Sequence, residues 1–176
     1  MDLDLDIIAA EAHENLPIFD RSGLLKNVLA QLKIKQHGAH GTNHWARVRR
    51  HALTIGESVG ADLLVVELFA FLHDSQRHNE WVDPDHGNRA ADYAVSLNRS
   101  LFDLDGDQLD LLCVAMRGHS NGKVDLHPTI QTCWDADRLD LGRVGIKPAA
   151  KYLSRHGAKH IAAAYEWSLG AKKYEH

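Results

Sequence analysis

Two adjacent residues of metal-binding type, His73 and Asp74, directly follow a mostly apolar run from Leu63 to Leu72. A run of that kind is typical of a buried helix, which has no structural need for an imidazole and a carboxylate at its end. With 13 histidines in 176 residues, chance alone produces about one His-Asp pair, so the pair needs support from elsewhere in the chain.

Three further segments carry matching side chains. His44 lies in the segment His-Trp-Ala-Arg-Val, His86 precedes Gly-Asn-Arg-Ala-Ala, and Asp137 lies in Ala-Asp-Arg-Leu. Two imidazoles and two carboxylates suit Mn, Fe, Co, Ni or Zn better than Ca, and they leave positions open for water and a substrate oxygen. The sequence therefore predicts a metal site between helices, with His44, His73, Asp74 and Asp137 as its ligands.

The register of the helix predicted over residues 128–141 distinguishes two neighbouring aspartates. Asp137 falls on the same face as Ile130 and Trp134, whereas Asp135 points to another side. A carboxylate in an apolar core costs several kcal/mol unless it is paired or bound to a cation. We therefore expect Asp137 to be the ligand, with Asp135 as the alternative or as a residue that orients a ligand.

The order of these segments resembles that of the HD superfamily of metal-dependent phosphohydrolases, in which a lone His, a His-Asp pair and a distant Asp lie on separate helices. The resemblance covers about residues 40–146, including the flanks Arg47-Val48 and Ala136-Asp137-Arg138-Leu139. It implies an all-α HD-domain bundle of about six to seven helices with the metal site between them. It also implies that Asp137 is the last ligand.

The resemblance also implies roles for two further histidines. In some HD proteins a His after the pair and another before the last Asp bind a second metal, and His86 and His119 occupy these positions here. The alternative is that they donate protons or contact phosphate beside a single ion. Either one or two divalent transition-metal ions are therefore expected as the cofactor.

Arg77 follows Asp74 by three residues, so on a continuing helix it would share a face with the site. Its planar guanidinium suits a phosphate, although a surface arginine is an equally good interpretation. The predicted catalytic residues are Asp74, His86, His119 and Arg77. For Arg47, Arg138 and Asp140 we predict buried ion pairs or, for Asp140, a substrate contact.

Caps and hydrophobic periodicity predict the helices that position these residues. The predicted helices run from Ser22 to about Gln36, from about Asn43 to Gly60, from Asp62 through His73, from His86 to about Leu97, from Asp103 or Asp105 to Gly118, from Pro128 toward Leu141, and onward from Pro148. No segment alternates between apolar and polar residues over a strand's length, so few or no strands are expected.

Length and composition set further limits. A chain of 176 residues fits one domain, which we place at 22–176 after an N-terminal extension at 1–21. A net charge of −4 and a pI near 6.3 argue against binding to long nucleic acids. Cys113 and Cys133 lie in apolar stretches and suit core positions in a reducing compartment. The acidic N-terminus is unlike a secretory signal and no run could span a membrane, so a cytoplasmic location is expected.

The histidines in polar or terminal segments are predicted to be solvated. They are His13, His156, His160 and His176.

The function that these features predict is metal-dependent hydrolysis of a phosphomonoester or phosphodiester, with a nucleotide as the leading candidate, by attack of metal-bound hydroxide. The expected partner is a small phosphorylated substrate, and a homo-oligomer stays open. The alternatives are another HD-fold metalloenzyme, of the diiron oxygenase or nitrile hydratase type, and a non-catalytic ligand-sensing domain.

Overall fold

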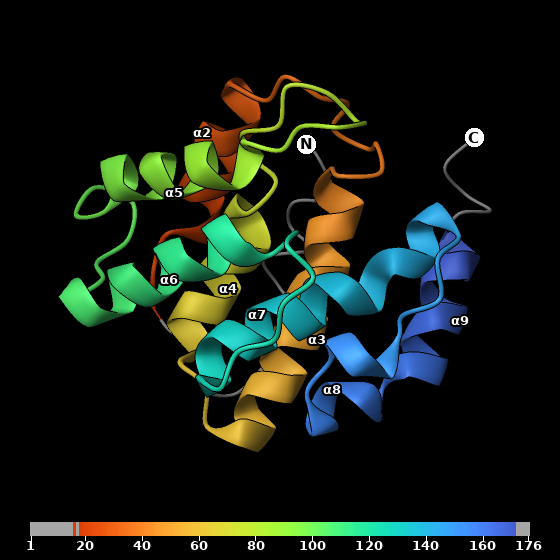
Figure 1. Ribbon diagram of the computed structural model, residues 1–176. Helices are drawn as coiled ribbons and strands as arrows, with labels where there is room; N and C mark the ends of the chain where they lie inside the picture. Colours follow the sequence, from red (N-terminus) through yellow and green to blue (C-terminus); the bar gives the residue numbers. More distant parts are fainter. Residues whose placement is uncertain (1–15, 17, 172–176) are drawn as a thin grey trace.

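The computed structural model describes residues 16 and 18–171, so most of the extension predicted at 1–21 lies outside the described part. Within that part the chain forms eight α-helices and two short 3-10 helices, and no strand (Figure 1). The helices are α2 (Arg21–Ala30), α3 (Thr42–Val59), α4 (Leu63–Leu72), α5 (His86–Leu97), α6 (Gly106–Gly118), α7 (Pro128–Leu139), α8 (Arg155–Ala158) and α9 (Ile161–Ala171), with η1 (Asp140–Val144) and η2 (Ala150–Tyr152). The expected all-α fold is confirmed.

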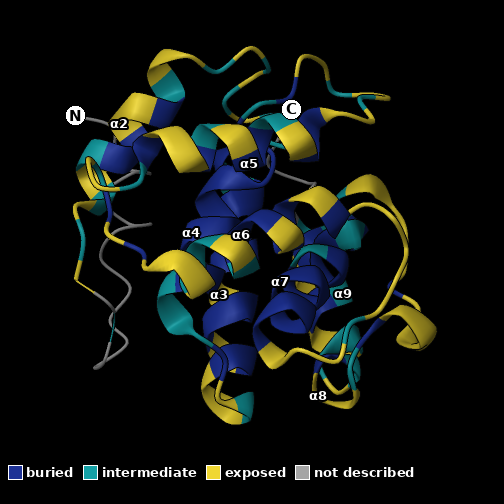
Figure 2. Ribbon diagram, turned by 60° about the vertical axis from the view of Figure 1, so that its left-hand side comes forward, coloured by how far each residue is buried: buried dark blue, intermediate teal, exposed yellow. Residues whose placement is uncertain are grey.

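Helix α4 is the central helix, as its composition predicts. All its residues from Val65 to Leu72 are buried, and α3, α6 and α7 pack around it. Figure 2 shows α4 almost uniformly buried, whereas the outer faces of α5 and α6 are exposed. Each fully buried Leu, Val or Phe contributes about 1.5–3 kcal/mol of transfer free energy, so this helix anchors the ends of its neighbours. The charge of Glu67 is tolerated in α4 because Arg49 Nε donates to its carboxylate at 2.7 Å.

Several helix ends form as the sequence predicts. The Asp62 carboxylate accepts from Val65 N at 3.1 Å, and Asp105 and Gln108 form a reciprocal capping box. Gly60 ends α3 with a φ of 70°, a left-handed conformation that glycine adopts without steric cost. Pro128 occupies the first turn of α7.

The first described helix differs from the prediction at both ends. Its N-cap is Asp20 rather than Ser22, because the Asp20 carboxylate accepts from Gly23 N at 2.8 Å and starts the helix two residues earlier. The helix ends at Ala30 rather than near Gln36.

The C-terminal part is also divided more finely than predicted. Instead of one helix after Pro148, the chain forms η2, α8 and α9. Ser154 causes one of these breaks, since its backbone N–H donates to Asp135 of α7 at 2.9 Å and its hydroxyl accepts from Gly157 N at 2.9 Å to cap α8. Both cysteines are buried, as expected. Within the described residues, no helix has the length and apolar character that crossing a membrane requires.

Candidate metal centre

Four predicted ligands from three parts of the chain lie together at the centre of the bundle. His44 lies in the first turn of α3, His73 and Asp74 follow the last residue of α4, and Asp137 lies near the end of α7. His44 Nε2 is 3.1 Å from His73 Nε2, 3.3 Å from Asp137 Oδ1 and 3.6 Å from Asp74 Oδ2. The distances from His73 Nε2 to these two carboxylates are 3.5 Å for Asp74 and 3.8 Å for Asp137. The structure thus brings the four residues into one group.

The two imidazoles of this first group are held by hydrogen bonds on their outer nitrogens. His44 Nδ1 lies 2.6 Å from Asp140 Oδ2, and His73 Nδ1 lies 3.0 Å from the carbonyl oxygen of Phe69. Both partners are acceptors, so each Nδ1 carries a proton and each Nε2 is directed into the group. The His73 ring also stacks on Phe69, with centroids 4.8 Å apart, which fixes its plane.

A second group shares Asp74 with the first. Asp74 Oδ1 is 3.3 Å from His86 Nε2 and 3.8 Å from His119 Nε2, and these two nitrogens are 2.8 Å apart. The outer nitrogens again meet acceptors: His86 Nδ1 donates to the Asp83 carbonyl, and His119 Nδ1 donates to the Met116 carbonyl at 2.6 Å. The two oxygens of Asp74 therefore face two different pairs of histidines.

A glycine allows this second pair to form. A side-chain carbon added at Gly87 would lie 2.4 Å from the Met116 carbonyl oxygen, so only glycine lets the start of α5 approach the end of α6 this closely. The same carbonyl orients His119, and His86 precedes the glycine. Gly87 thus places His86 beside His119.

The donor set fits a metal ion. In each pair the two Nε2 atoms lie 3.1 or 2.8 Å apart, and since both outer Nδ1 atoms carry protons, the Nε2 lone pairs repel unless a proton or a metal ion lies between them. In the second pair burial lowers the pKa of His119, but its hydrogen bond to Asp74 and the nearby carboxylate charges together outweigh burial and raise that pKa. Atoms that bind one ion at about 2.1 Å lie about 3.0–3.4 Å apart at tetrahedral or octahedral angles, close to the separations of the first group. Two groups of described residues have donors close enough to share an ion: His44, His73 and Asp74, and Asp74, His86 and His119.

Electrostatics within the site agree with this description. Burial lowers the pKa of His73 to about 3, so its ring is neutral and able to bind a metal at ordinary pH. Burial also raises the pKa of Asp74, but the neighbouring His73 and His119 outweigh it and hold that pKa well below its usual range. Asp74 is therefore an ionised carboxylate facing four imidazoles.

Asp135 and Asp137 lie on different sides of α7. Asp137 faces His44 and His73, as its register predicts, and its side chain is 14% exposed. Asp135 instead accepts from Gln131 Nε2 at 2.7 Å and from both the backbone and the hydroxyl of Ser154. Asp135 therefore joins α7 to the C-terminal segment and does not contact the histidines of either group.

Asp140 forms the predicted buried ion pair. Its carboxylate accepts from Arg47 Nε at 2.7 Å and Nη2 at 3.2 Å, as well as from His44. The ion pair predicted for Arg138 is absent from the described residues. Arg138 Nη1 donates instead to the Tyr152 carbonyl at 2.6 Å, and the guanidinium lies over the Trp134 ring.

Arg77 contacts the second group, although not for the reason predicted. Helix α4 ends at Leu72, so the chain reaches Arg77 through turns and not along a continuing helix. Arg77 Nη1 lies 3.4 Å from Asp74 Oδ1 and 3.3 Å from His86 Nε2. A guanidinium thus already supplies positive charge beside the second group and the aspartate that it shares with the first.

A cavity of about 320 Å³ opens onto both groups. Its lining includes Asp74, Arg77, His86, His119 and Asp137, and also residues that sequence reasoning did not single out: His40, Arg143 and Tyr152. Arg143 Nη2 lies 3.9 Å from Asp137 Oδ1. These additional residues come from a loop and from the short helices η1 and η2, where no periodicity indicates which side chains point inward.

The bundle and its shared aspartate define the class of protein: the chain has an HD-domain fold. A crystal structure of a predicted HD superfamily hydrolase from an uncultured Thermotogales bacterium superposes with a TM-score of 0.64. It is 25% identical in sequence, and the match covers 87% of this chain and 89% of that one. No protein-family model and no curated protein matches the chain.

Proposed function

We propose that this protein is a metal-dependent hydrolase of phosphomonoesters or phosphodiesters. The observation that carries the proposal is the pair of groups joined by Asp74, in which four imidazoles direct their Nε2 atoms to one carboxylate beside a cavity that is also lined by arginines. The likeness to a predicted HD superfamily hydrolase supports the reaction class. The basic lining supports a phosphoryl group as the part of the substrate that is bound.

The ligands of a first ion would be His44, His73, Asp74 and Asp137. A divalent ion held there would lower the pKa of a bound water toward about 7 and polarise a phosphoryl oxygen. Asp140 acts on the other side of His44, because its carboxylate fixes the ring by accepting the Nδ1 proton.

Two arginines are arranged to bind the phosphoryl group. Arg77 donates to the carbonyls of Asn79 and Trp81 at 3.2 and 2.6 Å, which leaves Nη1 beside Asp74. Arg143 donates to the carbonyls of Ala39 and Asp140 at 2.7 and 3.1 Å, which leaves Nη2 beside Asp137. Each guanidinium is therefore fixed by backbone groups, with one nitrogen directed to the ligand carboxylates. Held in this way, both suit the oxygens of a phosphate bound between them.

His86 and His119 have two possible roles. Their Nε2 atoms and Asp74 Oδ1 would bind a second ion, or they would exchange a proton with the substrate beside a single ion. The guanidinium of Arg77, 3.3 Å from His86 Nε2, supplies positive charge in the second case.

A nucleotide is the substrate class that we favour. Tyr152 lines the same cavity and is 40% exposed, and Lys151 Nζ lies over its ring at 4.8 Å from the centroid, so a base would stack on the part of the ring that Lys151 does not cover. The cavity volume of about 320 Å³ suits a small molecule and not a polymer.

The test is a screen of nucleotides and other phosphoesters against protein loaded separately with Mn, Fe, Co, Ni and Zn. Substitution of Arg77 or Arg143 by Ala should weaken substrate binding by about tenfold or more, because each change removes a charge-assisted hydrogen bond to phosphate. Arg117→Ala is the control, because Arg117 is exposed and pairs with Asp92 away from the cavity.

Failure of every phosphoester with every metal would contradict the proposal. An absorption spectrum of an oxygen-bridged diiron centre in iron-loaded protein would then favour the oxygenase alternative.

A further inference from the structure

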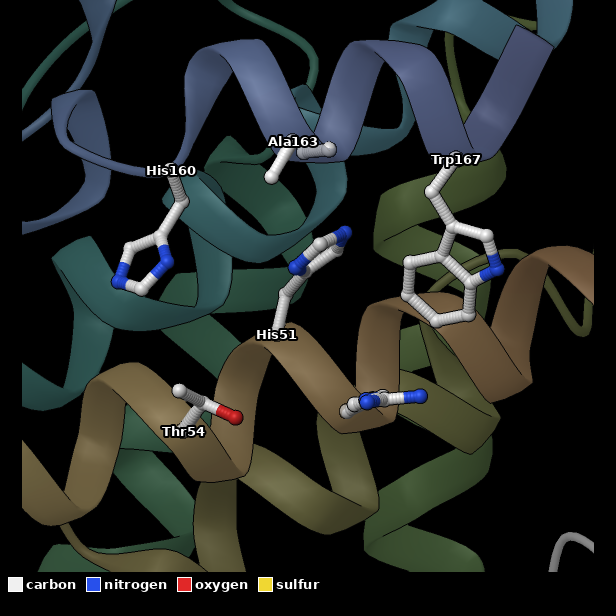
Figure 3. A pocket seen from close by; sticks show the side chains of 7 residues that line it. His51, Thr54, His160, Ala163 and Trp167 are labelled. Atoms are coloured by element: carbon white, nitrogen blue, oxygen red, sulfur yellow. The ribbon is translucent and has the colours of Figure 1, made fainter. Parts of the chain in front are cut away.

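A second cavity, of about 430 Å³, lies between α3 and the start of α9 and has a basic lining (Figure 3). It shares no lining residue with the cavity at the metal centre. Its lining residues are Arg50, His51, Thr54, His160, Ala163, Ala164 and Trp167. None of them is a carboxylate, so no acid in the lining neutralises the arginine or would repel an anion.

His51 presents an unsatisfied polar atom at this cavity. The residue is only 9% exposed, and its Nε2 is buried without a hydrogen-bond partner. In Figure 3 the imidazole stands between His160 and Trp167 and points toward α9. An unpaired buried nitrogen is destabilising, and a ligand group that bonded to it would remove that cost. This ring is therefore an unsatisfied polar group in the wall of the cavity.

The surrounding groups favour a negative charge. Arg50 carries a permanent positive charge at the edge of the cavity. Helix α9 begins at Ile161, and Ala164 N makes the bond to His160 O at 2.9 Å, so the N–H groups of 161–163 precede the first intrahelical hydrogen bond. Unpaired N–H groups and the positive end of a helix both stabilise anions.

An aromatic ring forms one wall of the cavity. Trp167 is 39% exposed, and its centroid lies 5.1 Å from the Arg50 guanidinium and 5.4 Å from the His51 ring. A flat ring bound beside Trp167 would cover this indole while an attached anionic group reached Arg50 and His160.

We propose that this cavity binds a small phosphorylated molecule that carries a flat ring, such as a nucleoside monophosphate. Arg50, His160 and the start of α9 contact the phosphate, His51 hydrogen-bonds to the ligand, and Trp167 packs on the ring. The site is separate from the metal centre, so the proposal does not depend on the reaction proposed there.

The experiment uses the full chain after removal of metals with a chelator, with adenosine monophosphate, adenosine and inorganic phosphate as probes. Binding is measured by calorimetry, and its position is read from the indole N–H signal of Trp167 in ¹H–¹⁵N spectra. The expected result is saturable binding of adenosine monophosphate that shifts the Trp167 signal, with adenosine and phosphate each binding at least about tenfold more weakly.

Two substitutions locate the anionic group. Arg50→Ala and His160→Ala should each weaken adenosine monophosphate binding by about tenfold. Lys159→Ala is the matched control, because it removes a neighbouring positive charge that does not line the cavity, and binding should be retained.

Three results would overturn the proposal. They are no binding of adenosine monophosphate at millimolar concentration, binding that leaves the Trp167 signal unchanged, and equal loss of binding in Lys159→Ala and Arg50→Ala. Phosphate binding as tight as that of the nucleotide would overturn the assignment of a ring to Trp167.

Discussion

The candidate metal centre and the cavity between α3 and α9 both contain histidines of α3, but they hold the imidazoles in different ways. His44 has an acceptor behind its Nδ1, as do the other three histidines of the centre. His51, two turns further along α3, has a buried Nε2 without a partner. A metal ligand needs its ring orientation and tautomer fixed, and only the first region provides this. The presence of histidines alone therefore does not identify a metal site in this chain.

The largest expected effect is the loss of one ligand carboxylate. Replacing Asp137 by Ala should remove metal from the protein and reduce activity by more than about a hundredfold, because the two imidazoles of the first group lose one of their two adjacent carboxylates. Replacing Asp135 by Ala should leave the metal content unchanged. It should cost about 1–3 kcal/mol of stability, because Ser154 and Gln131 lose their buried acceptor. Elemental analysis and thermal unfolding of both variants measure the difference.

The opposite outcome, with metal lost in Asp135→Ala and kept in Asp137→Ala, would show that the arrangement of α7 described above is wrong. Absence of metal from the unaltered protein, with no thermal stabilisation by Mn, Co, Ni or Zn, would remove the first group as a metal site.

The next effect concerns the second pair, His86 and His119. If these residues bind a second ion, changing either to Ala should lower the metal content by about one ion per chain and cause a large loss of rate. If they act on protons beside one ion, the metal content should stay constant while the pH–rate profile changes. Stoichiometry and rate measured on the same samples separate the two cases. A variant with full metal and full activity would exclude the altered histidine from the site.

A smaller effect is expected from replacing Asp140, whose carboxylate accepts the hydrogen bond that orients His44. Asp140→Asn should lower metal affinity by about 10–100-fold. A neutral amide oxygen is a weaker hydrogen-bond acceptor for the His44 Nδ1–H than the charged carboxylate is, so it orients the ring less firmly. Arg47 then loses its ion pair as well, so thermal stability is measured in parallel with the metal titration. Unchanged metal affinity in a folded variant would show that this acceptor does not matter.

The placement of the four residues of the first group close together could be predicted because local signals and the order of the segments agree. Periodicity alone separates Asp137 from Asp135, since the two lie on one regular helix with an apolar face. The caps at Asp62 and Asp105 and the stop at Gly60 follow from local hydrogen bonding, and these helix ends were predicted correctly. Local rules suffice where the interaction partners are a few residues apart.

The missed features depend on partners distant in sequence. Arg143 lies in a 3-10 helix after α7, and one of the two carbonyls that hold its guanidinium belongs to Ala39, 104 residues earlier. The break before α8 depends on Ser154 bonding to Asp135, 19 residues back. His160 was expected to be solvated but is partly buried and lines the second cavity. None of these contacts leaves a periodic signal, so each appears only once the helices are packed.

The smallest expected effect is on the pH dependence of the unfolding free energy, which should differ between the buried His51 and an exposed histidine. Burial lowers the pKa of His51 from 6.5 to about 4, so as the pH falls below 6.5 the unfolded chain takes up a proton that the folded chain does not. Stability is therefore unaffected above that range and falls as the pH drops from 6.5 to 4, by at most about 3 kcal/mol. In metal-free protein, His51→Phe should flatten the dependence of unfolding free energy on pH between 4 and 6.5, whereas the exposed His156→Phe should not. An unchanged slope in His51→Phe would mean that His51 takes up a proton as readily in the folded chain as in the unfolded one. That result would contradict the claim that His51 has a buried, unpaired nitrogen, which is the feature that distinguishes this cavity from the candidate metal centre.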